Sequence, residues 1–148
     1  MGAVHAEELS DAALRELLAR TRTIAVVGIK AGAGDAAFRV PRYLQARGYR
    51  IVPVNPKLEQ VLGEPALASL REVREPIDLV DVFRAAAHVP AHVDEILALS
   101  PAPRAVWLQQ GIRNDAAAAR LRDAGIAVIQ DRCLKVEHAR LFGSGGEP

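Results

Sequence analysis

Five short apolar runs alternate with helical patterns along the chain, and this alternation constrains the fold more than any other feature. The runs carry little polar alternation, as strands do when helices cover both faces of their sheet. Strands that alternate with helices form parallel sheets through right-handed crossovers. The sequence therefore predicts an α/β fold, a three-layer, doubly wound sheet of five parallel strands. The predicted strands are Thr23–Val27, Arg50–Val54, Ile77–Val82, Arg104–Leu108 and Ile126–Ile129.

Helices are expected between and around these strands. Ser10 and Asn114 are plausible N-caps, and Gly48 and Gly125 mark helix ends. A weak, short helix is expected within residues 68–73. No repeat or linker interrupts the pattern, so we expect a single domain over residues 1–142 and a flexible tail, GSGGEP, over 143–148. The helices are expected over residues 10–20, 36–47, 90–99, 114–124 and 134–142.

Composition excludes several classes of function for the 148-residue chain. The net charge is +1 and charges of both signs are dispersed, so no polybasic surface for nucleic acid or anionic lipid is expected. No apolar run approaches the roughly 20 residues of a membrane span. The acidic, amphipathic first 17 residues do not resemble a secretory signal, and the single cysteine, Cys133, suits a reducing compartment. A cytoplasmic protein is therefore expected.

In an open parallel sheet, ligands bind at the carboxyl ends of the strands. The loop after the first strand runs from Gly28 to Arg39 and contains Gly32, Gly34 and Lys30. Its glycines permit a sharp turn and close approach to a ligand, and the helix start offers N–H groups to a phosphate. The glycine spacing matches neither standard nucleotide motif. A flexible turn without a ligand is the alternative.

The loop after the second strand contains Asn55, Pro56 and Lys57, where an NAD site would carry an acid. An ammonium group attracts a ribose phosphate, whereas a carboxylate repels it. The loop therefore suits an adenosine nucleotide that is phosphorylated on its ribose, which leaves NADP and coenzyme A (CoA) open. A rigid turn with a solvated lysine is the alternative.

The loop after the third strand begins with Phe83 and Arg84, which could form a wall and a clamp for a ligand. A core phenylalanine and a surface arginine are the alternative. Asp78 and Asp81 are three residues apart and point to opposite faces of a strand, so they are not an acid–base pair. Asp81 is interpreted as a buried residue that organises a loop.

The last two loops contain several reactive groups. Gln109, Gln110 and Gly111 could contact a polar ligand arm or simply form polar surface. Cys133 and His138 would make a sparse metal site or a nucleophile pair, but their spacing places them on different faces of a helix. We therefore expect no metal site, and we interpret this segment as a charged helix end that braces the sheet or a partner.

Several stretches together resemble the small stand-alone CoA-binding proteins, whose Rossmann-like fold is similar to that of the succinyl-CoA synthetase α-subunit. The resemblance covers nearly all of the chain beyond residue 20. The stretches, in the order that the family shows, are TIAVVGIK (23–30), RVPRYLQARGYRIVPVNPK (39–57), LGEPALASL (62–70), PIDLVDVFR (76–84), VWLQQGIRN (106–114) and DRCLKVEHARLF (131–142).

This resemblance implies a CoA site built from the first strand–helix loop, the Asn-Pro turn and the loop after the third strand. The first loop, KAGAGDAAF, departs from the serine- and proline-bearing pattern of the family. The residues implied are Gly28, Ile29, Lys30, Arg39 and Val40 for the pyrophosphate; Asn55, Pro56 and Lys57 for the ADP end; Phe83, Arg84 and Ala85 beside adenine or pantetheine; and Gly111 nearer the thiol arm.

The expected function is binding of CoA or an acyl-CoA as a small-molecule ligand, more in keeping with a binding module than with an enzyme. The related ligase uses a phosphorylated histidine in a further domain, and His138 lies in a different context. Two alternatives stay open: an NADP-dependent oxidoreductase domain, and a CoA-responsive regulatory protein acting through a partner or a homo-oligomer.

Overall fold

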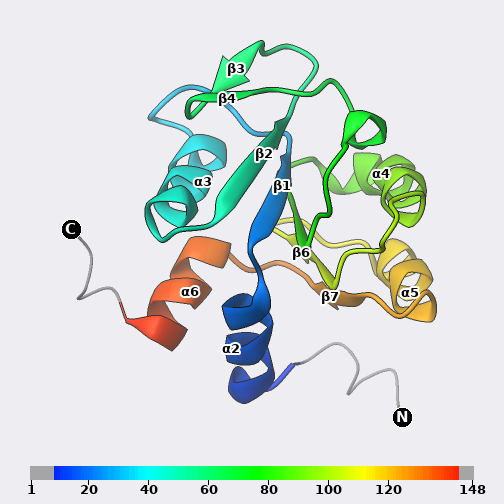
Figure 1. Ribbon diagram of the computed structural model, residues 1–148. Helices are drawn as coiled ribbons and strands as arrows, with labels where there is room; N and C mark the ends of the chain where they lie inside the picture. Colours follow the sequence, from blue (N-terminus) through cyan, green and yellow to red (C-terminus); the bar gives the residue numbers. More distant parts are fainter. Residues whose placement is uncertain (1–8, 144–148) are drawn as a thin grey trace.

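The predicted sheet of five parallel strands forms the centre of the molecule. The structure, a computed structural model, describes residues 9–143, and it confirms the α/β fold class (Figure 1). All neighbouring strands pair in parallel, in the order β2-β1-β5-β6-β7. The expected tail lies outside the described residues except for Gly143. The strands are β1 (Thr23–Val27), β2 (Arg50–Val54), β5 (Leu79–Val82), β6 (Ala105–Leu108) and β7 (Ala127–Ile129).

The strand order reverses direction between β1 and β5. From β1 the chain steps to β2 on one side, and then crosses back to place β5 on the other side of β1. The chain therefore leaves β1 toward a helix on one face of the sheet, Ala36–Ala46, and leaves β5 toward a helix on the other face, Val89–Leu97 (Figure 1). Ligands of open α/β sheets bind at such a switch point.

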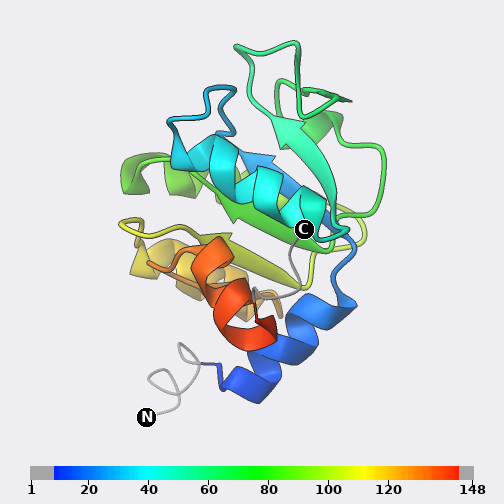
Figure 2. The same cartoon turned by 90° about the vertical axis from the view of Figure 1, so that its left-hand side faces the viewer.

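Helices cover both faces of the sheet. Figure 1 shows α3 on one side of the sheet and α4 and α5 on the other. Figure 2 shows α3 and α6 side by side in front of the sheet, with α2 below them, and α6 packs against both α2 and α3. The helices are α2 (Asp11–Arg20), α3 (Ala36–Ala46), α4 (Val89–Leu97), α5 (Asp115–Asp123) and α6 (Leu134–Phe142).

Alternate residues of the strands build two apolar cores. Ile24 and Val26 of β1 face the layer of α2, α3 and α6, whereas Ala25 and Val27 face α4 and α5. Trp107 of β6 is completely buried in the first core and donates its indole N–H to the Arg132 carbonyl at 2.8 Å. Burying a large apolar side chain contributes about 1.5–3 kcal/mol, so the two cores hold the sheet rigid beneath its loops.

The predicted helices form with small shifts at their ends. Ser10 and Asn114 cap α2 and α5, since their side-chain oxygens accept from the N–H groups of Ala13 and Ala117. Gly48 has φ +100°, which suits the residue that ends α3. The short helix expected within residues 68–73 is a single 3-10 turn, η1 (Leu70–Glu72).

A small hairpin after β2 was not predicted. Strands β3 (Gln60–Val61) and β4 (Glu64–Pro65) pair antiparallel around Leu62 and Gly63, which both have positive φ. Such two-residue turns usually carry Asn-Gly, so Leu-Gly gives only a weak signal in the sequence. A second 3-10 turn, η2 (Ala86–His88), precedes α4. Within the described part of the chain, no helix is long and apolar enough to cross a membrane.

Candidate functional site

A hollow of about 390 Å³ lies at the carboxyl edge of the sheet. Loops after β1, β5 and β6 surround it, together with the starts of α3 and α6. It therefore occupies the side of the sheet where the ligand was expected. Its lining residues are Lys30, Asp35, Ala36, Ala37, Phe83, Arg84, Ala85, Gln109, Gln110, Ile112 and Cys133.

A second, smaller hollow of about 40 Å³ lies between the β2 turn and α4. Asn55, Pro56 and Gly28 line it, and so does Arg84, which also lines the larger hollow. The two hollows are therefore neighbours that share Arg84 in their walls. Together they form a crevice that crosses the switch point between β1 and β5.

Gly28 is required by the packing of the loops beneath the crevice. Its φ is +84°, and a Cβ at this position would lie 2.5 Å from the carbonyl oxygen of Phe83. Its N–H donates to the Val54 carbonyl at 2.9 Å. Gly28 therefore lets the loop after β5 pack against the loop after β1, in addition to the sharp turn that the sequence predicted. The next residue, Ile29, has its side chain fully buried in the core.

The start of α3 differs from the phosphate cradle that the sequence suggested. The Asp35 carboxylate caps the helix and accepts from the Ala37 N–H at 3.3 Å. It also lies 3.9 Å from the Lys30 ammonium group. The expectation that this helix start offers unpaired N–H groups to a phosphate is therefore wrong for Ala37, because a carboxylate already occupies the N-terminal end of the helix.

The Asn55 side chain ties the β2 turn to the first loop. Its amide nitrogen donates to the Ile29 carbonyl at 2.7 Å, and its side-chain oxygen accepts from the Lys57 N–H at 2.8 Å. Both functional ends of the amide are thus engaged within the protein. Asn55 fixes the position of Pro56, which is exposed beside the smaller hollow.

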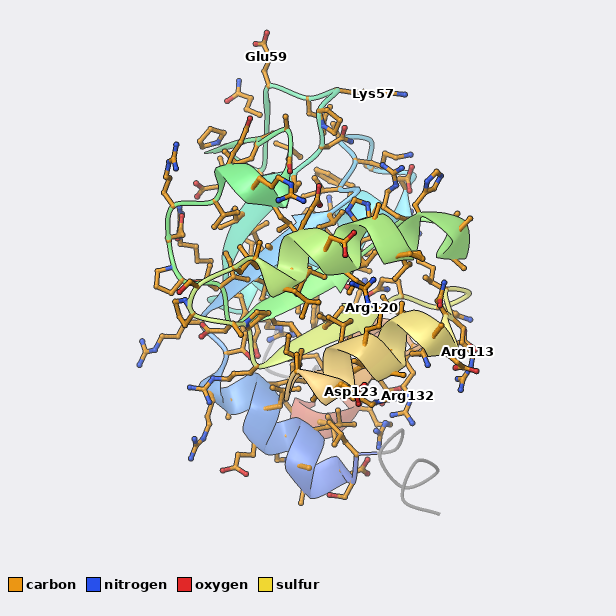
Figure 3. The ribbon with its side chains drawn as sticks, turned by 90° about the vertical axis from the view of Figure 1, so that its right-hand side faces the viewer. Lys57, Glu59, Arg113, Arg120, Asp123 and Arg132 are labelled. Carbon is orange, nitrogen blue, oxygen red and sulfur yellow. The ribbon has the colours of Figure 1, made fainter. Side chains whose placement is uncertain are left out.

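Lys57 follows this turn and its side chain is exposed. Figure 3 shows it extending away from the body of the molecule. Its ammonium group has no hydrogen-bond or ion-pair partner within residues 9–143. Arg39 of α3 is also exposed, but its guanidinium donates to the Ala33 carbonyl at 3.2 Å and closes the first loop on itself.

Arg84 is the most distinctive group in the crevice. Its side chain is half-buried, and its guanidinium has no hydrogen-bond or ion-pair partner among the described residues. Half-buried guanidinium groups are ordinarily paired with an acid or a carbonyl. Phe83 and Ala85 flank Arg84 and line the larger hollow. The arrangement suits a ligand that carries negative charge at the middle of the crevice.

Five of the predicted residues line neither hollow: Ile29, Arg39, Val40, Lys57 and Gly111. Val40 is buried in the α3 core, where its side chain packs beneath the loop. Gly111 has φ +86° and its N–H donates to the Asp131 carboxylate at 2.7 Å, so it shapes the loop after β6. Arg39 contacts the first loop. Ligand contact by any of the predicted residues stays a prediction.

A polar group beside the smaller hollow was not predicted from the sequence. Glu95 of α4 accepts from Ser69 Oγ at 3.2 Å and lies 3.0 Å from Nδ1 of His92. All three residues line the hollow near Asn55. The only signal in the sequence was a histidine and a glutamate three residues apart at the start of a helix, which is common on helix surfaces.

The last helix braces the molecule, as one interpretation of the sequence held. Arg140 bonds Asp11 of α2 at 2.8 Å and Glu137 at 2.7 Å. His138 is buried, and its Nδ1 lies 3.1 Å from the Tyr43 hydroxyl on α3. Burial and the nearby Arg47 lower the pKa of His138. No group of three or more His, Cys, Asp or Glu side chains within residues 9–143 is placed to hold a metal.

Asp81 does not organise a loop, in contrast to the prediction. It is completely buried in β5, and neither carboxyl oxygen has a hydrogen-bond partner within the described chain. Burial raises its pKa well above the ordinary value of an aspartic acid. Asp78, three residues earlier, instead accepts from the backbone N–H groups of Arg22 and Thr23.

Two larger hollows lie away from the carboxyl edge of the sheet. One of about 510 Å³ is lined by residues of η1, the segment after it and the end of α4, and the other, of about 590 Å³, includes Tyr49 and Phe142. Neither contains any residue of the three predicted loops. Position at the switch point, rather than size, therefore identifies the crevice as the candidate site.

Relatives of known sequence or structure cover almost the whole chain. The uncharacterized protein YneT of Bacillus subtilis is 41% identical over 130 residues, which is 88% of this chain and 95% of YneT. A structure from Thermus thermophilus, "cell-free ID.343", is 46% identical, with a TM-score of 0.87 over 90% of this chain and 100% of that one. A hypothetical protein from Pyrococcus horikoshii is 33% identical, with a TM-score of 0.88 over 93% and 95% of the two chains.

A family model described as "CoA binding domain" matches residues 22–139. The match begins just before β1 and ends within α6, so it includes every loop that lines the crevice. The resemblance seen in the sequence is thereby confirmed, and this chain belongs to the family of CoA binding domains.

Proposed function

We propose that the chain binds CoA or an acyl-CoA in the crevice at the switch point. The observation that carries the proposal is Arg84, a half-buried arginine that lines both hollows and has no hydrogen-bond or ion-pair partner among residues 9–143. CoA has its negative charge in the middle, at the pyrophosphate, with an adenosine phosphate at one end and a pantetheine arm at the other. The crevice offers its groups in the same order, with the Asn55-Pro56 turn and Lys57 at one end, Arg84 in the middle and the larger hollow at the other end.

The direction of the ligand follows from the charges and the apolar surface. Lys57 and the Asn55-Pro56 turn lie at the end with the smaller hollow, where the ammonium group would face the ribose phosphate. Phe83 and Ile112 line the larger hollow, where the less polar pantetheine arm would lie. The ADP end is therefore assigned to the β2 turn and the thiol end to β6 and α6.

The carboxylate of Asp35 determines where the pyrophosphate lies. It caps α3 and is about half exposed beside the larger hollow, so a phosphate directly over that helix would meet a negative charge. Arg84 offers the opposite charge on the facing loop. The ammonium group of Lys30 would interact with both the Asp35 carboxylate and the ligand. The pyrophosphate is accordingly held from the side of β5, and Gly28 allows that loop to come close.

Calorimetric titration with CoA, and separately with NADPH, tests this function. We expect CoA to bind, NADPH not to displace it, and Arg84→Gln to weaken CoA binding about tenfold or more because one charge-assisted contact contributes about 1.5–3 kcal/mol. NADPH binding that CoA does not compete with, or no heat on addition of CoA, would refute the proposal. Arg104→Ala is a suitable control, since Arg104 is an exposed arginine at the opposite edge of the sheet.

A further inference from the structure

Cys133 and Gln109 lie together at the end of the crevice assigned to the thiol. Gln109 follows β6 and Cys133 precedes the first residue of α6, and both line the larger hollow. The side-chain oxygen of Gln109 accepts from the Leu134 N–H at 3.1 Å. This bond holds the amide group of Gln109 against the peptide that joins Cys133 to α6.

The amide nitrogen of Gln109 is available to a ligand. Only 4% of the residue is exposed, and Nε2 has no hydrogen-bond partner within residues 9–143. Because Gln109 lines the larger hollow, this donor stays accessible to an acceptor on a ligand bound there. The pantetheine arm carries amide carbonyls, one of them close to its sulfur, and these are suitable acceptors.

Cys133 is the only cysteine of the chain and is partly exposed in the same wall. A carbonyl held by Gln109 Nε2 would place the sulfur of the arm beside the Cys133 thiol. We infer that this end of the crevice is a thiol–disulfide exchange site, at which Cys133 forms a mixed disulfide with CoA. This inference rests on the proposed function, because it needs the ligand to lie with its thiol end at Gln109.

The exchange uses a CoA disulfide as the co-reactant. The Cys133 thiolate attacks one sulfur of the disulfide, a bond forms between Sγ and that CoA sulfur, and the original S–S bond breaks. The second CoA leaves as a thiolate and takes up the proton that Cys133 lost. The number of disulfide bonds is unchanged, so no further oxidant is required.

Mass spectrometry of the intact protein measures this reaction. We expect incubation with CoA disulfide to add one CoA less two hydrogen atoms, reversibly on addition of a reductant, and Cys133→Ser to add nothing. The rate should saturate with CoA disulfide and exceed that for the disulfide of pantetheine, which lacks the nucleotide, by about tenfold or more, since the nucleotide contacts raise affinity. Lys57→Ala should slow the first reaction and leave the second unchanged.

Gln109→Glu gives a second readout, because it keeps the acceptor for Leu134 and removes the amide donor. It should slow exchange with both disulfides at least threefold, provided that its thermal transition shows a folded protein. Equal rates for the two disulfides in the normal protein, with no protection by reduced CoA, would mean an ordinary surface thiol and would overturn the inference. If calorimetry shows that Cys133→Ser binds CoA but the normal protein forms no adduct, the inference is overturned and the proposed function stands. Loss of CoA binding altogether would overturn both.

Discussion

Removal of the Lys57 ammonium group tests the orientation of the ligand. Lys57 is exposed at the end of the β2 turn and points away from the body of the molecule (Figure 3). The proposed site places it beside the ribose phosphate of CoA, which dephospho-CoA lacks. Lys57→Ala should therefore weaken binding of CoA and leave binding of dephospho-CoA nearly unchanged.

The magnitude follows from the exposure of Lys57. Two unit charges 4 Å apart in water attract by about 1 kcal/mol, and a phosphate group carries about 1.5 to 2 negative charges. The ordering of a flexible side chain and screening by salt reduce this gain. We expect a difference of about 1–1.5 kcal/mol between the two ligands, or about five- to twelvefold in affinity.

Calorimetry of both ligands with the normal protein, Lys57→Ala and Arg104→Ala gives the required comparison. Arg104→Ala removes one positive charge at the far edge of the sheet and should lower both affinities equally and slightly. The specific loss in Lys57→Ala should shrink as salt is raised. Equal losses for CoA and dephospho-CoA in Lys57→Ala would refute the assignment of the ADP end to the β2 turn.

Two further predictions concern the fold beneath the site. Gly28→Ala should lower the free energy of unfolding by about 2 kcal/mol or more, because the positive φ and the Phe83 carbonyl at 2.5 Å both oppose a side chain. Gly34→Ala meets nothing within 4 Å and should raise the free energy of unfolding by about 0.4–1 kcal/mol. Similar denaturant melts for the two variants would contradict this prediction. Asp81 has a raised pKa in the folded state. Between the ordinary aspartate pKa and this raised value, the folded protein therefore binds more protons than the unfolded protein. The contribution of Asp81 to stability falls as pH rises through that window. In that window the free energy of unfolding of Asp81→Asn should therefore rise relative to that of the normal protein, by up to about 1.4 kcal/mol per pH unit. Asp123→Asn, on the exposed face of α5, is the control, and its free energy of unfolding should differ from that of the normal protein by an amount that does not vary with pH (Figure 3). Denaturant melts from pH 4 to 7 distinguish the two variants.

The fold could be predicted from the sequence because its signals are local. The β-branched runs, the capping residues Ser10 and Asn114 and the glycines that end helices each determine a short segment, and alternation then determines the parallel sheet. The hairpin over residues 60–65 escaped prediction because Leu62 adopts a positive φ without an asparagine or glycine at that position. Its geometry depends on contacts with β2 rather than on turn propensity.

The site could be predicted only as a set of loops. Sequence order identifies which loops meet at the sheet edge, but not which side chains face one another there. Asn55 is used within the turn rather than left for a ligand, and Asp35 caps the helix that was expected to receive a phosphate. Arg84 lines both hollows, and Gln109 is bonded to the start of α6, through contacts between residues distant in sequence.

A crystal structure of the protein soaked with CoA measures the central claim most directly. The account predicts electron density across the switch point between β1 and β5, with the pyrophosphate against Arg84, the ribose phosphate toward Lys57 and the sulfur beside Gln109 and Cys133. CoA bound in either of the larger hollows, in the reverse direction along the crevice, or nowhere at the carboxyl edge would contradict it.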